Sequence, residues 1–400
     1  MRSYGWVVLV PTMVMLLLTV FPPEGNAIPA FARRHKVSCT TCHAPFPTLK
    51  PFGDEFAGSG FVMPDDDPDR DYIIEGDELL RLNRDFPISA RFDAYAMFEE
   101  SADVDNDLQT PWGLKLMSGG VLYRNIGYYF YFYMSERGEV VGIEDAYVHF
   151  NDIMGQPFDV MVGQFQTSDP LMKRELRLTF EDYQIYKVRP GGSGTNLAYD
   201  RGLMLVYGLE ETGTDLVGMI VNGNGSAEAG ADRKFDSDRF KNVGFRISQA
   251  IGEHLSVGGF FYRGEEAPDV GWKNEMTYYG PDVNAAAGPL ELTAQYLTRT
   301  DSAPPELYTP GGKEPDEDIE TAGLVAELIL RPQLDESTWL LTLLYNQVDY
   351  DQAAVAAQDY ETMTVSATHL LARNLRFIVE YTRDLEGETS RGVLGFVAGI

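Results

Sequence analysis

Apolar and polar residues alternate with a period of two from Phe86 to the end of the chain. Near the start of this region, Ile88 and Phe92 fall on one face, while Arg91 and Asp93 fall on the other. Because successive side chains of a strand point to opposite faces, the pattern predicts β-strands with one apolar and one polar face. We count about sixteen such segments, which start near residues 87, 113, 126, 140, 156, 197, 213, 238, 254, 271, 289, 318, 337, 360, 375 and 388.

Short alternating segments of this number fit a membrane β-barrel, whose strands need about 9–11 residues each. The aromatic-rich segment 126–134 fits the rings that line the two membrane interfaces of such barrels. A soluble sandwich or propeller is the alternative. The nearly uninterrupted apolar faces, and a last segment that runs to Ile400, favour the membrane protein. We therefore predict that residues 86–400 form a porin-like antiparallel β-barrel of about sixteen strands, surrounded by outer-membrane lipid.

The chain is strongly acidic, with 61 Asp and Glu against 32 Lys and Arg and a formal net charge of −29. This excludes nucleic acid as a partner, because phosphate binding needs a basic face. The long connections are expected to be exposed loops, because they are rich in Gly, Pro, Asp and Glu and show little periodicity; they are 166–196, 224–239 and 301–318. Cations such as Arg91, Lys115 and Arg376 are scattered along the sequence, whereas a phosphate pore would need a ladder of them.

The first residues have the pattern of a secretory signal peptide at 1–27, with a positive residue, an apolar run and a small-residue cleavage site. After this leader no run of 18 apolar residues occurs, so we expect no transmembrane helix. Residues 28–85 differ in composition from the barrel region. We expect helices over 49–56 and 75–85, joined by an acidic linker at 65–71.

The only two cysteines of the chain lie in Cys39-Thr40-Thr41-Cys42-His43. The pattern C-x-x-C-H is the attachment motif of a c-type haem. Cys39 and Cys42 add to its two vinyl groups, and His43 is placed as the proximal iron ligand. The alternatives are a redox-active thiol pair or an accidental one. We predict one covalently bound haem c, and hence one-electron transfer rather than bond-making chemistry.

The sixth ligand of the iron would set its reduction potential and its access to small molecules. Met63, 20 residues after His43, is one candidate, although a methionine there could equally fill the core. His35 is the alternative distal ligand. His149 shares a strand face with Asp145 and is expected to line the barrel lumen.

A wider set of residues surrounds the haem motif: Ile28-Pro29-Ala30-Phe31-Ala32-Arg33, Phe46-Pro47, Leu49, Phe52-Gly53, Phe56 and Gly60-Phe61. Together with the motif, this set resembles the fused monohaem cytochrome–porins of the outer membrane. The best-known branch of that family consists of the iron(II)-oxidising outer-membrane cytochromes of iron-oxidising bacteria. Segments 144–148 and 162–165 of the barrel region also resemble phosphate-selective-type porins.

The resemblance implies a small α-helical cytochrome c domain with its acidic linker at 28–85, in front of the barrel at 86–400, in a bacterial outer membrane. It implies an Fe(II):cytochrome c oxidoreductase, which passes one electron from extracellular Fe(II) to a periplasmic c-type cytochrome or another electron carrier. Because so small a domain has too little core to be stable alone, we expect it to plug the barrel. Two other functions remain open: a porin-type solute or anion channel with a haem-bearing plug, and electron export to an external acceptor.

Overall fold

The computed structural model describes residues 30–44, 46–63, 72–73, 76–80, 82–83, 86–100, 105–137, 142–168, 170, 172–225, 228–267, 272–305, 318–351 and 359–400. The predicted signal peptide at 1–27 and the acidic linker at 65–71 lie outside these residues. In the described part of the chain, no helix is long and apolar enough to cross a membrane.

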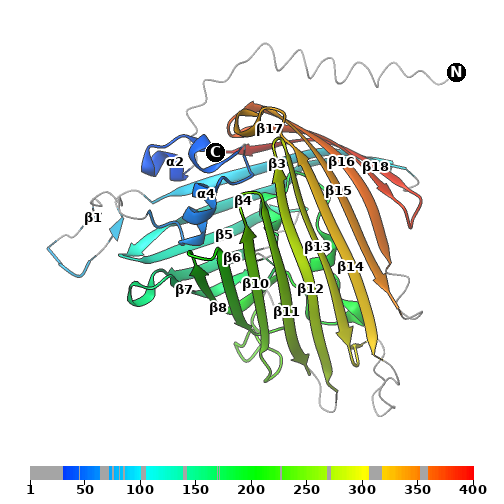
Figure 1. The fold of residues 1–400 in the computed structure, drawn as a ribbon, viewed down its shortest axis with the longest axis horizontal. Helices are drawn as coiled ribbons and strands as arrows, with labels where there is room; N and C mark the ends of the chain where they lie inside the picture. Colours follow the sequence, from blue (N-terminus) through cyan, green and yellow to red (C-terminus); the bar gives the residue numbers. More distant parts are fainter. Residues whose placement is uncertain are drawn as a thin grey trace.

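Sixteen antiparallel strands form a closed barrel (Figure 1). Each strand pairs with its neighbours in chain order, and the last strand closes the barrel on the first. The strands are β3 Ile88–Glu99, β4 Asn106–Tyr123, β5 Ile126–Glu136, β6 Gly142–Phe150, β7 Phe158–Gln166, β8 Tyr199–Leu209, β9 Thr214–Val221, β10 Asn242–Ile251, β11 Leu255–Glu266, β12 Asn274–Ala287, β13 Leu290–Asp301, β14 Ile319–Leu330, β15 Trp339–Tyr350, β16 Tyr360–Ala372, β17 Leu375–Asp384 and β18 Ser390–Gly399. The predicted porin-like barrel is confirmed. Only β4 begins well away from its predicted start near residue 113.

The two ends of the barrel differ in the length of their connections. At the end where β3 begins and β18 ends, the strands are joined by short turns, of which the longest is 331–338. The other end has the long connections, such as 167–198 and 222–241. Outer-membrane barrels have short turns on the periplasmic side. We therefore name the end with the short turns the periplasmic mouth.

The strand faces alternate as the sequence predicts. On β16, Thr364 and Ser366 are buried toward the lumen, while Met363 and Val365, which alternate with them, are exposed on the outer surface. Such an apolar outer face is what a lipid-embedded barrel requires. The aromatic segment 126–134 is a partial exception to the prediction. Its rings do not all lie at the membrane interface, because Tyr131 and Tyr133 are buried in the lumen.

The connection 167–198 folds back into the barrel, which corrects the prediction of an exposed loop at 166–196. It contains the short 3-10 helices η2 Arg174–Leu176, η3 Gln184–Tyr186 and η4 Pro190–Gly192. Leu178, Tyr186 and Leu197 are completely buried, and the last two pack with inner-wall residues of the strands. We name this segment the inner loop. Its apolar residues have no regular period, so the sequence pattern did not reveal that they are buried.

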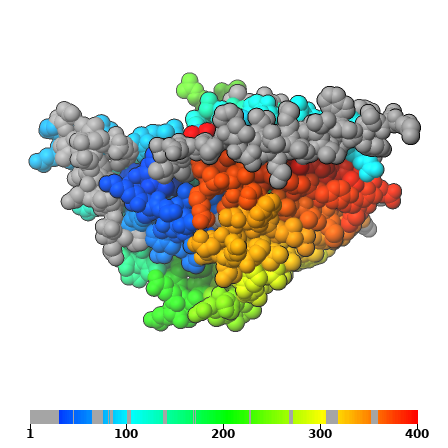
Figure 2. Space-filling view, turned by 90° about the horizontal axis from the view of Figure 1, so that it is seen from above, coloured from blue at the N-terminus to red at the C-terminus, as the bar shows by residue number. Residues whose placement is uncertain are grey.

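The N-terminal segment lies in the periplasmic mouth beside the C-terminus (Figure 1). Its helices are α2 Ala30–His35, α3 Cys39–Cys42 and α4 Pro51–Gly58, of which α4 corresponds to the helix predicted over 49–56. Figure 2 shows this blue segment packed against the orange strands near the C-terminus. The helix predicted over 75–85 is wrong, because β1 Tyr72–Ile73 and β2 Leu82–Asn83 pair there as antiparallel strands.

Candidate cofactor site in the periplasmic mouth

The two cysteines stand at the ends of the single turn α3. Ser38 caps this turn, since its hydroxyl accepts a hydrogen bond from the backbone N–H of Thr40 at 3.3 Å. Residues three apart in a helix share one side, so Cys39 and Cys42 face the same way. Both are partly exposed and neither forms a disulfide. Two thiols on one side of one turn are what two thioether bonds to a single haem require.

His43 follows directly and is held by its own backbone and by a nearby carbonyl. Its N–H donates to the carbonyl of Cys39 at 2.9 Å, and its ring Nδ1 lies 3.1 Å from the carbonyl oxygen of Pro47. Because a carbonyl only accepts, Nδ1 carries the proton and Nε2 keeps its lone pair. Burial lowers the pKa of His43, which favours the neutral ring that a metal needs. The residues present therefore fit a haem c.

Helix α4 packs closely against the haem motif. A Cβ at Gly53 would lie 2.2 Å from the carbonyl oxygen of Cys42, so only glycine allows this approach. Behind α4, the rings of Phe31, Phe56 and Phe61 form a small core, with Phe31 stacked on Phe61 at 4.7 Å between centroids. This core is too small to be a stable domain without the barrel.

One barrel wall holds this segment through β5, β6 and the turn after β6. The ring of Phe61 lies 4.8 Å from that of Tyr129 on β5. Gly60 has a φ of +63° and packs on His149 of β6, where an added Cβ would lie 2.6 Å from the histidine Cβ. Asn151 Nδ2 donates to the carbonyl of Ser59 at 2.6 Å.

Other parts of the barrel hold the opposite side of the segment. Arg331 Nη1 donates to the carbonyl of Ala44 at 3.1 Å. The guanidinium of Arg376 lies 5.9 Å from the ring centroid of Phe46. From the inner loop, Lys173 Nζ lies 2.6 Å from a carboxylate oxygen of Asp54 on α4. Contacts on several sides hold the N-terminal segment in the mouth. We call the described residues of 30–63 the plug.

The distal ligand stays a prediction. Met63 is half-buried at the end of its described segment. His35 ends α2 and packs its ring edge-on against Phe56, at 5.5 Å between centroids. His149 faces the lumen as expected, with 1% of its surface exposed. Among the described residues, no hydrogen bond or ring contact joins Met63 or His149 to His43.

Above the plug, the lumen holds a cluster of charged residues. Arg91 Nε lies 2.8 Å from Asp93, and Lys115 Nζ lies 3.9 Å from the same carboxylate and 3.4 Å from Glu175 of the inner loop. Lys115 also donates a hydrogen bond to the hydroxyl of Tyr133. Strand pairing thus gathers Arg91 and Lys115, which looked scattered in the sequence. They form a mixed cluster with carboxylates rather than a purely basic ladder.

A second group of charges holds the inner loop together. Asp182 accepts hydrogen bonds from Arg174 at 2.5 and 3.1 Å and from Lys187 at 3.3 Å. Burial alone would raise the pKa of Asp182, but Arg177 and Arg174 outweigh it and hold the pKa well below its usual range. Burial alone would likewise raise the pKa of Glu175, but Lys115 and the nearby arginines lower this pKa to about 2.

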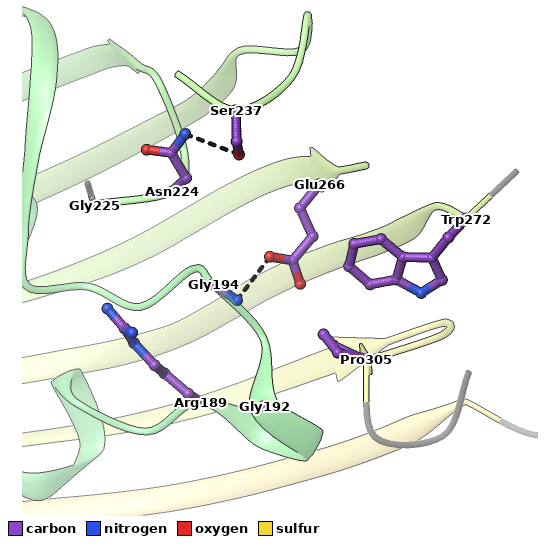
Figure 3. A pocket seen from close by; sticks show the side chains of 9 residues that line it. All are labelled: Arg189, Gly192, Gly194, Asn224, Gly225, Ser237, Glu266, Trp272 and Pro305. Atoms are coloured by element: carbon purple, nitrogen blue, oxygen red, sulfur yellow. Dashed lines mark hydrogen bonds between the residues drawn. The ribbon is translucent and has the colours of Figure 1, made fainter. Parts of the chain in front are cut away.

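A separate cavity of about 410 Å³ lies at the opposite mouth, between the inner loop and the neighbouring long connections (Figure 3). Glu266 on its wall accepts hydrogen bonds from Ser193 at 2.6 Å and from the N–H of Gly194 at 2.8 Å. None of the predicted site residues lines this cavity. Within the described ranges, no group of three or more His, Cys, Asp or Glu is arranged to bind a metal ion.

No family model matches the chain, and no curated protein matches it in sequence. Solved structures of outer-membrane porins do match it in fold. An anion-selective porin from Comamonas acidovorans is 13% identical with a TM-score of 0.55, over 79% of this chain and 99% of that one. OmpT of Vibrio cholerae is 12% identical with a TM-score of 0.54, over 78% and 98%. The outer membrane channel DcaP of Acinetobacter baumannii is 16% identical with a TM-score of 0.51, over 79% and 97%.

These similarities show that the chain has the fold of an outer-membrane porin. The apolar outer face of the closed barrel agrees with that fold, and together they place the chain in an outer membrane. The sequence motif predicted the cysteines and His43. It did not reveal Pro47 as the ring's partner or the barrel residues that hold the plug, because these contacts depend on tertiary structure.

Proposed function

We propose that this protein is a haem-bearing porin that oxidises extracellular Fe(II) by one electron and passes the electron to a periplasmic cytochrome or another carrier. It would then be an Fe(II):cytochrome c oxidoreductase. When bound, haem c supplies reversible one-electron transfer. The observation that supports this most directly is the 3.1 Å contact from His43 Nδ1 to Pro47, beside two thiols on one helical turn.

The chain's own residues have separate tasks in this proposal. Cys39 and Cys42 hold the haem, and His43 offers Nε2 to the iron. The barrel contacts keep the plug at the periplasmic mouth, within reach of a periplasmic electron carrier. The inner loop and the plug together obstruct the lumen, so that bulk solutes do not pass freely. The net charge of −29 favours the approach of a divalent cation.

Two other functions use the same architecture. A solute or anion channel is supported by the porin fold and by the lumen cations Arg91, Lys115, Arg174 and Arg177, and it requires that the plug leaves a passage. In electron export, the same residues would carry electrons in the opposite direction. The reduction potential of the haem decides which direction is favoured.

Anaerobic stopped-flow mixing of the purified full-length protein with Fe(II) separates these functions. We expect the haem absorbance to shift to that of the reduced form, and a variant with Cys39→Ala and Cys42→Ala to show no such change. A haem that stays oxidised in excess Fe(II) at the working pH would overturn iron oxidation. Solute flux through reconstituted protein that also fails to be reduced would favour the channel.

A further inference from the structure

Two arginines are among the most deeply buried side chains of the described chain, and their surroundings differ sharply. Arg299 is 2% exposed and fully bonded: its guanidinium contacts both carboxylate oxygens of Asp301, at 2.5 and 2.6 Å, as well as Ser193 and the carbonyl of Thr195. Arg376 is equally buried at 2%. Its Nε and Nη1 have no hydrogen-bond partner among the described residues.

A buried guanidinium without an acceptor is unfavourable, because the charge has lost its hydrogen bonds to water and gained no others. The charged and titratable groups that act most strongly on Arg376 are Arg91, Asp93 and Tyr95 of β3 and Arg177 of the inner loop. Asp93 is already bonded to Arg91 at 2.8 Å. The pairing across β17, β18 and β3 places the Cα atoms of Asp93 and Arg376 two strand spacings apart, about 10 Å. Among the described residues, no carboxylate accepts a hydrogen bond from the Nε or Nη1 of Arg376.

The position of Arg376 points to where its partner lies. It is the second residue of β17, in the periplasmic mouth. Its guanidinium lies 5.9 Å from the ring centroid of Phe46, and that ring lies 5.2 Å from the ring of His43. One aromatic ring thus separates the unpaired cation from the histidine that is placed to bind the haem iron.

We propose that Arg376 pairs with a propionate carboxylate of the haem held by Cys39 and Cys42. This inference rests on the proposed presence of haem. The planar guanidinium matches a carboxylate with two parallel hydrogen bonds, and its free Nε and Nη1 are donors for such a contact. The barrel wall, and not only the plug, would then hold the cofactor. A positive charge beside the propionate also favours the reduced iron and raises the reduction potential.

The reduction potential of the haem-loaded full-length protein tests this pairing. We compare Arg376→Met with Arg383→Met, which removes the same charge from the far end of the same strand, where Arg383 lies 3.9 Å from Glu100. Arg376→Met should lower the ratio of reduced to oxidised haem at fixed potential about tenfold, on the order of 59 mV. The same substitution should also make the reduction potential depend on pH near the pKa of the propionate that has lost its partner. Arg383→Met should change neither.

Infrared redox difference spectra give a readout that does not depend on activity. The propionate bands should shift between the wild type and Arg376→Lys, which keeps the charge but loses the two parallel bonds. Unchanged bands, or an unchanged potential in haem-loaded Arg376→Met, would overturn the pairing and leave the proposed function standing. If Arg376→Met fails to insert, the Arg376→Lys spectra decide alone.

Two further results distinguish a failure of the Arg376 pairing from a failure of the proposed function. A wild-type potential that changes with added acetate, and no longer does so in Arg376→Met, would assign Arg376 to a solute anion and overturn the proposal. Wild-type protein without covalent haem on a denaturing gel would instead remove the proposed function itself.

Discussion

Asn151 Nδ2 lies 2.6 Å from the carbonyl oxygen of Ser59, so a side chain that follows β6 holds the plug in the barrel mouth. The same amide contacts the carbonyl of Asn125 at 3.2 Å. Asn151→Ala removes both bonds and should weaken plug docking by about 1–3 kcal/mol. Single-channel recordings should show more frequent open events. The exposed Asn284 near the same mouth is the control, and Asn284→Ala should not alter the recordings; equal behaviour of the two variants would contradict the role of Asn151.

A substitution at Gly60 tests how closely the plug packs against the barrel wall. Gly60→Ala places a Cβ 2.6 Å from that of His149 and puts alanine at a φ of +63°. The backbone strain costs about 1–2 kcal/mol, and the clash adds to it. Limited proteolysis of the plug should therefore be faster in Gly60→Ala. Gly76→Ala is a control for backbone strain outside the plug, since Gly76 has a φ of +80° and no described residue comes within 4 Å of an added Cβ. Proteolysis of the plug that is no faster in Gly60→Ala than in Gly76→Ala would contradict the close fit at His149.

The haem and the barrel should be separable by mutation. His43→Ala, or the double change Cys39→Ala with Cys42→Ala, should abolish the native haem spectrum. Because each strand of the closed ring is hydrogen-bonded along both edges to neighbouring strands and not to the haem motif, both variants should still insert as barrels. Heat-modifiable migration on gels measures insertion. Loss of that migration together with the haem would contradict the independence of barrel and cofactor.

Glu175 and Asp182 should help to hold the inner loop in place at neutral pH and lose this effect only in acid. The folded-state pKa values of Glu175 and Asp182 lie below their ordinary values, as buried cations oppose protonation. Their stabilisation is therefore complete above the unfolded pKa values of about 4 and is lost as the pH falls through the folded values. The part of the loop's stability that depends on Asp182 should therefore be constant from pH 8 to about 5 and fall below about 4. Asp182→Asn should raise conductance at neutral pH, and the difference from the wild type should shrink in acid. Equal conductance of Asp182→Asn and the wild type at pH 7 would contradict this role of Asp182.

The barrel could be predicted from the sequence because a single physical rule, alternation of lipid-facing and lumen-facing residues, repeats in every strand. Met363 and Val365 illustrate it on β16. The first residues of β4, from Asn106, are mostly polar and precede Pro111, so the alternation does not mark the start of this strand. The inner loop was missed because Leu178 and Tyr186 are buried without any period.

The candidate site could be proposed from the sequence only where its residues are adjacent. Cys39, Cys42 and His43 form a local motif that predicts haem attachment. Arg376 looked like an isolated lumen cation, because only barrel closure brings β17 to the plug, more than 300 positions away in the chain. Contacts of that sequence separation have no local pattern from which they could be inferred.

Electron transfer across the barrel can be measured in vesicles that contain the protein, with oxidised cytochrome c trapped inside and Fe(II) added outside. We expect the trapped cytochrome to be reduced in vesicles with the wild-type protein and to stay oxidised with the variant Cys39→Ala, Cys42→Ala. Trapped cytochrome that stays oxidised with the haem-loaded wild type, or that is reduced equally with the variant, would contradict the proposed function.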